Sequence, residues 1–417
     1  MNIYMKNLNK KTGLFFLLFI LGLASSFNPD AGAATVAFTD VPAAHWAKSG
    51  IDTAVNKGYA EGYPGGLFMP DASVTRAEFI KMIVTATGQP VEASEGKWYE
   101  SYVGAAEQAG LYATGDFANS EVEWNREITR QEMARIAARA AGLDTEIDDR
   151  WMYMTDKMNN IDYKWMYLAA KTGLISGLGA GKLGEKEHTT RAQAVAAVER
   201  VLTVLSGGKL KTDKYAISSA ELAWHKTNVF TMMPEYFDYD GSWSPFGGRE
   251  GQWREDKLTL NSKDGKYSAT LHELVAIDLE DPNDPNLKNV PPLNTLKWSF
   301  GEYNNPGFPV SNYKKAYLVY WKSTVKNDDP DHYSSYDFAR VNIDGIGDSH
   351  KPGRDKGILT IPASVHVKEY GDSPYYIIPK VGKEQLWSSV SISMQTSVRS
   401  NYYFVQEVLL SVSPHGD

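Results

Sequence analysis

The chain has 417 residues, of which 42% are hydrophobic and 23% are charged, and its formal net charge at pH 7 is −8. This composition predicts a globular protein of two to three domains rather than a disordered tail. The acidic balance argues against nucleic-acid binding. The chain contains no cysteine, which excludes disulfides, thiolate chemistry, a lipid-modified cysteine and any Cys-based metal site.

The first 33 residues have the pattern of a secretory signal peptide. Three lysines precede the apolar stretch 13–27, and Ala31-Gly32-Ala33 offers a small-x-small cleavage site. The apolar stretch is short for a membrane span and no second one follows, so no transmembrane segment is expected after cleavage; an uncleaved N-terminal anchor is the alternative. Cleavage near Ala34 removes three Lys and one Asp, which moves the formal charge from −8 to −10.

A Thr-Arg pair recurs three times, in SVTRAEF at 73–79, EITRQEM at 127–133 and HTTRAQA at 188–194. Glycines lie at matched distances before each pair, and they follow the first two pairs at equal distances. This spacing predicts an internal repeat of about 50–60 residues, each copy folding as helix, Gly-rich loop and helix. The last helix of the third copy should be about one turn longer. Because a single two-helix unit leaves an apolar face uncovered, the three copies are expected to pack together.

The Thr of each pair and the residue three positions later fit a capping box at the start of a helix. The capping residues are Thr75 with Glu78, Thr129 with Glu132, and Thr190 with Gln193. The capping box does not explain the arginine, which stands at the first helical position, where the helix dipole disfavours a cation by roughly 0.3–1 kcal/mol. An internal carboxylate or an anionic ligand would compensate, and the residues alone leave both alternatives open.

The first copy, FTDVPAAHWAKSGIDTAVNKGYAEGYPGGLFMPDASVTRAEFIKMIVTATG, resembles an S-layer homology domain almost from end to end. The second copy is similar to it and the third is looser, so the resemblance covers about residues 36–206. It implies three tandem repeats, at 36–90, 91–145 and 148–206, which form an all-α pseudo-threefold prism with grooves between its lobes. It also implies non-covalent anchoring to the wall of a Gram-positive-type bacterium.

The ligand implied by the resemblance is a secondary cell-wall polysaccharide, often with a pyruvate ketal on N-acetylmannosamine. A ketal carboxylate is the kind of anion that the arginines need, so the resemblance favours the ligand alternative. Carried over to this sequence, the implied polysaccharide-binding residues are Arg76, Arg130, Arg191, Asp40, Asp156, Trp46, Trp98, Gly62, Gly65, Gly66, Gly177 and Gly181. Small residues let a sugar approach the backbone, and Trp faces suit sugar rings, although helix-packing core is the alternative for both Trp residues.

The copies differ in ways that bear on binding. The second copy has no counterpart of Asp40 and lacks the GYPGG run of the first loop. The third has Ile161 in the place of the helix-start Trp. The groove that uses Arg76 is therefore expected to be the most competent, with the other two binding weakly or serving only for packing.

After a polar linker at 207–214, residues 215–417 change to β-branched and aromatic composition. Alternating apolar and polar residues at 390–398, a turn at 399–401 and a returning strand predict a hairpin. The fold class is thus multidomain α + β, with a mostly-β, sandwich-like C-terminal domain and an early helix near 217–228. Further predicted strands lie within 268–279, 316–325, 336–344 and 358–370.

The C-terminal half contains no recognised catalytic, cofactor or metal motif. Acid pairs such as Asp278 with Glu280 fit solvated strand ends, and Asp344 with Asp348 lack the ligand count of an EF-hand. We therefore expect a secreted protein of the cell wall or S-layer that binds a secondary cell-wall polysaccharide, with a structural or adhesive C-terminal domain that could self-associate or bind a surface partner. A wall-anchored enzyme acting on polysaccharide and a self-assembling S-layer protein are the alternatives.

Overall fold

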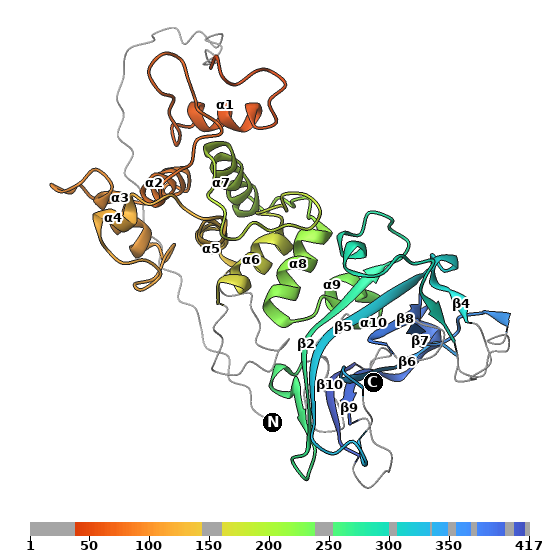
Figure 1. Ribbon diagram of the computed structural model, residues 1–417. Coiled ribbons are helices and arrows are strands. Elements are labelled where there is room, and N and C mark those ends of the chain that lie inside the picture. Colours follow the sequence, from red (N-terminus) through yellow and green to blue (C-terminus); the bar gives the residue numbers. More distant parts are fainter. Residues whose placement is uncertain are drawn as a thin grey trace, which may run out of the picture. The chain divides into compact units, whose positions relative to one another are not determined.

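The computed structural model describes residues 38–143, 161–237, 253–299, 307–333, 336–348, 356–367, 373–396 and 404–412. The signal peptide, Asp156 and the turn at 399–401 lie outside these residues. Helices prevail up to residue 237 and antiparallel strands after it (Figure 1). The chain thus joins a helical N-terminal half to a β-rich C-terminal region.

Three long helices each begin at a Thr-Arg pair: α2 (Arg76–Ala86), α5 (Arg130–Ala140) and α7 (Arg191–Leu205). The first two have 11 residues and α7 has 15, so the predicted extra turn is present. After α1, Gly58 adopts a φ of 75°, which suits a glycine that ends a helix. The other helices of this half are α1 (Lys48–Asn56), α3 (Glu100–Gln108), α4 (Glu121–Trp124), α6 (Ile161–Thr172) and α8 (Lys214–His225).

Each long helix is held at its start by a capping box. The hydroxyls of Thr75, Thr129 and Thr190 accept a hydrogen bond from the backbone N–H three residues on. The Glu or Gln at that third position accepts the N–H of the capping threonine in return. Two of the N–H groups that a helix start leaves unpaired are thereby satisfied in each case.

The residues just before the three capping boxes meet in a ring of backbone hydrogen bonds. Val74 donates to the carbonyl of Thr189 at 3.0 Å, Thr189 donates to Ile128 at 2.9 Å, and Ile128 donates back to Val74 at 2.9 Å. All three residues are fully buried. Since a buried N–H without a partner is costly, the ring fixes the register of the three segments against one another.

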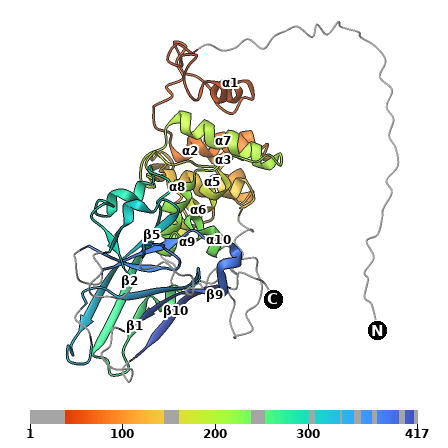
Figure 2. The same ribbon diagram turned by 90° about the vertical axis from the view of Figure 1, so that its right-hand side faces the viewer.

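The helices continue this cyclic arrangement. Helix α2 packs against α3, α5 against α6, and α7 against α1, while α2, α5 and α7 contact one another (Figure 2). Their apolar side chains form one continuous cluster that runs from Phe38 to Val201. Each pair therefore covers the apolar face of another pair, as the three-copy pattern predicts.

Helix α8 begins at Lys214, earlier than predicted, because Asp213 caps it by accepting the N–H groups of Tyr215 and Ala216. Ala216 also joins the helical cluster. Farther along the helix, Glu221 is fully buried and accepts the backbone N–H groups of Phe230 and Thr231 at the start of α9 (Val229–Met232). Burial raises the pKa of this carboxyl to about 8, against the opposing effect of these donors and of Lys171.

The strands of the described residues form two antiparallel sheets, one of seven strands in the order β1-β2-β5-β8-β7-β3-β4 and one of three in the order β10-β9-β6. The two longest strands, β2 and β5, run side by side (Figure 1). The bounds are β1 (Thr259–Asn261), β2 (Tyr267–Asp278), β3 (Lys297–Trp298), β4 (Phe308–Pro309), β5 (Ala316–Asn327), β6 (Arg340–Ile346), β7 (Ala363–His366), β8 (Tyr375–Pro379), β9 (Leu386–Gln395) and β10 (Gln406–Val412).

The wide sheet is buried on both faces. On one face Leu274 of β2 shares a cluster with Ile392 of β9, so the two sheets have a common core, which α10 (Pro234–Phe237) also enters. On the other face Val275 packs in a separate cluster with Leu318 and Trp298. The predicted hairpin is present as β9 and β10, which pair antiparallel.

We expect Thr75→Ala to lower the free energy of unfolding by about 1 kcal/mol, because it removes the cap of α2. Thr85→Ala is the matched control, since Thr85 is exposed within the same helix. It should be neutral or slightly stabilising because alanine has the higher helix propensity. Urea denaturation measures both, and an equal effect of the two substitutions would contradict the capping role.

Glu221 makes stability depend on pH. Its pKa is raised in the folded state, so the stability that it contributes is complete below the pKa of the unfolded chain, about 4.3, and is lost as the pH rises toward about 8. Glu221→Gln removes this loss. The stability of the variant relative to the parent chain should therefore increase from pH 5 to pH 8 in thermal unfolding, and a difference independent of pH would contradict the assignment.

Candidate functional site

The three arginines of the Thr-Arg pairs are buried, and each reaches a segment of another copy. Arg191 contacts the loop at 61–68, Arg76 contacts Glu123 and Glu132, and Arg130 contacts Ser176 and Leu183. Their exposed fractions are 9%, 5% and 4%. The arginine at each helix start, which the helix dipole disfavours, thus has partners within the protein, and these partners differ in charge.

Among the described residues, no carboxylate forms a hydrogen bond with Arg191. Its Nε donates to the carbonyl of Phe68 at 2.9 Å, one terminal nitrogen donates to the carbonyl of Glu61 at 2.6 Å, and the other donates to the hydroxyl of Tyr63 at 3.3 Å. The guanidinium carbon lies 4.7 Å from the ring centre of Tyr63 and 4.6 Å from that of Phe68. Two aromatic rings and three oxygens therefore fix the orientation of this cation.

Asp40 shapes the same loop. Its two carboxylate oxygens accept the backbone N–H groups of Phe68 at 2.8 Å and Met69 at 2.7 Å. Burial alone would raise the pKa of Asp40, but these two hydrogen bonds and the charge of Arg191 hold it below its ordinary value. The structure therefore brings Asp40 together with Arg191, and not with Arg76 of its own copy.

The glycines of this loop have two different roles. Gly65 and Gly66 take φ values of 86° and 72° at the tip, and a side chain there would meet open space. Gly62 is instead packed against the ring of Phe38, where a Cβ would clash. Only the tip of the loop therefore offers open backbone to a ligand.

Arg76 is neutralised by the protein itself. It donates to Glu132 through Nε at 3.3 Å and through a terminal nitrogen at 2.6 Å, and its other terminal nitrogen reaches a carboxylate oxygen of Glu123 at 2.5 Å. Burial alone would lower the pKa of Arg76, but these two acids raise it overall. Arg76 is therefore compensated by internal carboxylates and not by a ligand. The groove that uses Arg76 had been expected to bind the ligand best, and its ion pairs argue against that expectation.

Arg130 resembles Arg191 in its partners. It donates to the carbonyls of Leu183 at 2.9 Å and Ser176 at 2.8 Å. Burial lowers its pKa, while Glu187 opposes this effect and Arg200 adds to it. The glycines of its loop are less open than those of the first. The N–H of Gly177 donates to Asp213, and a Cβ on Gly181 would lie 2.9 Å from the ring of Pro285.

Trp46 and Trp98 are not helix-packing core. Their exposed fractions are 64% and 53%. Trp46 stacks against His45, and Trp98 lies edge-on to Tyr99. Trp165, in contrast, is buried. The two exposed indoles are therefore available as apolar platforms, whereas Trp165 belongs to the interior.

Sequence reasoning missed the aromatic partners of the arginines. Tyr63 and Phe68 flank Arg191, and the ring of Phe117 lies 4.6 Å from the guanidinium of Arg76. A signal for them exists, because the loops of the first two copies each carry an aromatic residue, GLF and GDF, between their glycine and the next helix. Among the residues that the structure describes, no group of three or more His, Cys, Asp or Glu is arranged to hold a metal ion.

Comparison with known proteins identifies the first copy. Residues 37–80 match the S-layer homology domain family. The chain is 34% identical over 125 residues to the S-layer protein sap of Bacillus anthracis, which covers 28% of this chain and 15% of the relative. It is 31% identical over 177 residues to the amylopullulanase of Thermoanaerobacterium thermosulfurigenes, and 31% identical over 181 residues to the exoglucanase XynX of Acetivibrio thermocellus. These two matches cover 38% and 40% of this chain, and 9% and 16% of the respective relatives.

The chain therefore contains an S-layer homology domain, and it spans a small part of the length of the relatives that it matches. The domain and the S-layer relatives indicate a secreted protein that is associated with the cell wall. Within the described ranges, none of the helices has the length and apolar character needed to cross a membrane.

Replacing Arg76 by Met should lower the free energy of unfolding by about 3 kcal/mol, because it leaves the partly buried Glu132 without its cation and takes from Glu123 the more buried of its two arginines. Arg126→Met is the matched control. Arg126 pairs with the same Glu123 from an exposed position, so its loss should cost under about 1 kcal/mol. Chemical denaturation compares the two variants, and similar losses would show that Arg76 does not act through a buried ion pair.

Proposed function

We propose that the helical half anchors the protein non-covalently to a secondary cell-wall polysaccharide. The three copies would be three S-layer homology repeats, at 36–90, 91–145 and 148–206, arranged as a pseudo-threefold prism. The ring of hydrogen bonds at Val74, Ile128 and Thr189 supports this architecture. The cyclic packing of α2 against α3, α5 against α6 and α7 against α1 also supports it.

The proposal rests on the hydrogen-bond partners of Arg191. It donates three hydrogen bonds, all to uncharged oxygens, and a guanidinium has more donors than that. Its charge is therefore oriented but not neutralised by a contacting carboxylate. A carboxylate on a sugar, such as that of a pyruvate ketal, supplies the missing anion and can form charge-assisted hydrogen bonds.

The surroundings of Arg191 suit a sugar. Tyr63 presents an exposed aromatic ring beside the guanidinium, and Gly65 and Gly66 leave the loop tip without side chains. Asp40 can accept hydrogen bonds from hydroxyl groups, since its pKa is held low and it stays ionised. We therefore assign the primary groove to Arg191 with Asp40, a secondary groove to Arg130, and a structural role to Arg76.

The C-terminal region is proposed to be structural or adhesive. The amylopullulanase and the exoglucanase among the relatives are enzymes by name, which is the reason to test this region for polysaccharide hydrolysis as the alternative.

Pull-down of the full chain on purified cell walls tests the anchoring. Arg191→Gln should reduce the bound fraction at least about tenfold, because a hydrogen bond between charged groups contributes roughly 1.5–3 kcal/mol. Walls from which the ketal pyruvate has been removed should bind the parent chain equally weakly. Arg126→Gln removes an exposed arginine and should bind like the parent chain.

Since Arg191 is buried, a second variant separates binding from folding. Trp46→Ala removes an exposed side chain and should weaken wall binding without changing the melting temperature. Trp387→Ala removes another exposed indole, in the β-rich region, and should leave binding unchanged. Full binding by a folded Arg191→Gln variant would overturn the assigned groove. Full binding to ketal-free walls would overturn the assigned ligand.

A further inference from the structure

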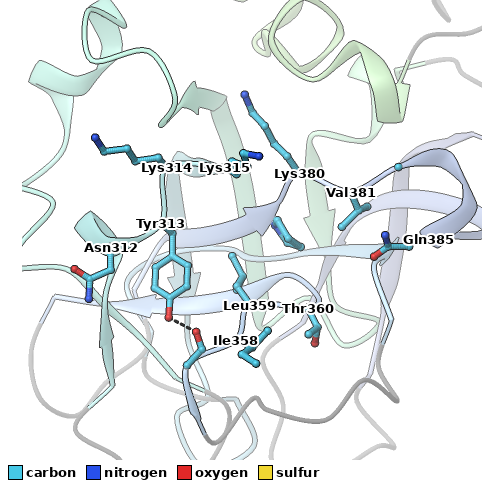
Figure 3. A pocket seen from close by; sticks show the side chains of 13 residues that line it. Asn312, Tyr313, Lys314, Lys315, Ile358, Leu359, Thr360, Lys380, Val381 and Gln385 are labelled. Atoms are coloured by element: carbon cyan, nitrogen blue, oxygen red, sulfur yellow. Dashed lines mark hydrogen bonds between the residues drawn. The ribbon is translucent and has the colours of Figure 1, made fainter.

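A cavity of about 790 Å³ lies in the β-rich region, where β5 begins and β8 ends. Three stretches of chain line it: Asn312–Lys315, Gly357–Thr360 and Pro379–Gly382, with Gln385 completing the wall. Figure 3 shows the lysines along one side of the cavity and the Ile358–Thr360 stretch opposite them. The size falls within the range of ordinary ligand sites, roughly 300–1,000 Å³.

The cavity is cationic, although the chain as a whole is acidic. Lys314, Lys315 and Lys380 line it, and none of its 13 lining residues is Asp or Glu. Lys380 is held by Asp278 at 2.6 Å and by Glu280 at 2.9 Å, so its charge is balanced. Lys314 and Lys315 are exposed and form no ion pair with the described residues. The cavity therefore has two uncompensated positive charges at its rim.

The opposite wall has a polar group without a partner. Thr360 is 4% exposed, and its hydroxyl forms no hydrogen bond with any described residue. The oxygen itself has almost no accessible surface, so Thr360 closes the wall rather than offering a hydrogen bond to the cavity. The wall is also fixed in place. The hydroxyl of Tyr313 donates to the carbonyl of Gly357, where a Cβ would lie 2.6 Å from the ring of Phe308.

We propose that this cavity binds an anionic oligosaccharide through its carboxylate or phosphate group. Lys314 and Lys315 would attract the anion, since an ammonium is a compact point charge suited to either group. The amides of Asn312 and Gln385 supply hydrogen bonds for sugar hydroxyls. The described residues that line the cavity include no carboxylate pair of the kind that glycoside hydrolysis uses, so we propose binding.

This second site does not depend on the wall-anchoring grooves. Titration calorimetry on the full chain tests it with three probes: tetragalacturonate, which carries carboxylates; a glycerol-phosphate oligomer, which carries phosphodiesters; and maltotetraose, which is neutral. At least one anionic probe should bind and the neutral probe should not. The preferred anionic probe identifies which anion the cavity takes.

Two sets of variants assign the binding to the cavity. Lys314→Gln with Lys315→Gln should weaken the anionic probe about tenfold. Lys209→Gln with Lys211→Gln removes the same charge from two exposed lysines of the linker and should change the affinity less than about twofold.

Three outcomes would overturn the proposal. The first is that neither anionic probe binds the parent chain. The second is that both double variants weaken binding equally, which would indicate attraction by overall charge. The third is that the Lys314 and Lys315 double variant binds like the parent chain. Because the Arg191→Gln variant should keep the affinity for these probes, failure here and failure of the wall anchoring can be told apart.

Discussion

The helical half depends on one constraint, the ring in which Val74, Thr189 and Ile128 exchange backbone hydrogen bonds. Each ring residue lies two positions before an arginine, with a capping threonine between them. The ring therefore decides where the three long helices start and, at the same time, where the three guanidinium groups leave the backbone. The cyclic packing of the helices follows from the same ring. A helix whose start is fixed can cover the apolar face of only one neighbouring helix pair.

The three arginines share a position but not an electrostatic environment. Arg76 lies between two carboxylates of the second copy, so its ion pairs hold the second copy against the first. Arg191 and Arg130 are oriented by carbonyl oxygens, which fix a cation without cancelling its charge. One position in the repeat thus provides a structural cross-link in one place and a preorganised cation in two others. The difference arises from Glu123 of α4 and from Glu132, the capping glutamate of α5, because both carboxylates reach Arg76.

Local patterns in the sequence were sufficient to predict helices and strands, but not which distant residues they contact. The Thr and Glu spacing located the starts of α2 and α5, and strict alternation located β9. Which loop an arginine reaches is a property of cyclic packing, which leaves no local trace, so Asp40 could not be assigned to Arg191. The strand predicted within 358–370 begins only at Ala363 because Pro362 cannot donate to a ladder, and the last three residues of that range lie outside the described ones. The lysine-lined cavity joins segments far apart in the chain, and no motif marks it.

The two halves of the molecule would recognise anions by opposite physical means. In the helical half the guanidinium of Arg191 is 9% exposed and lies between two rings, so its orientation is settled before a ligand arrives and salt screens it weakly. At the cavity, Lys314 and Lys315 are exposed on flexible stems, so their attraction acts at longer range and is screened strongly. Buried, stacked arginine favours selectivity for one substituent, and exposed lysines favour capture of a charged polymer with little selectivity. An acidic chain that meets an anionic polymer needs such local cationic sites at both contacts, because its overall charge opposes the encounter.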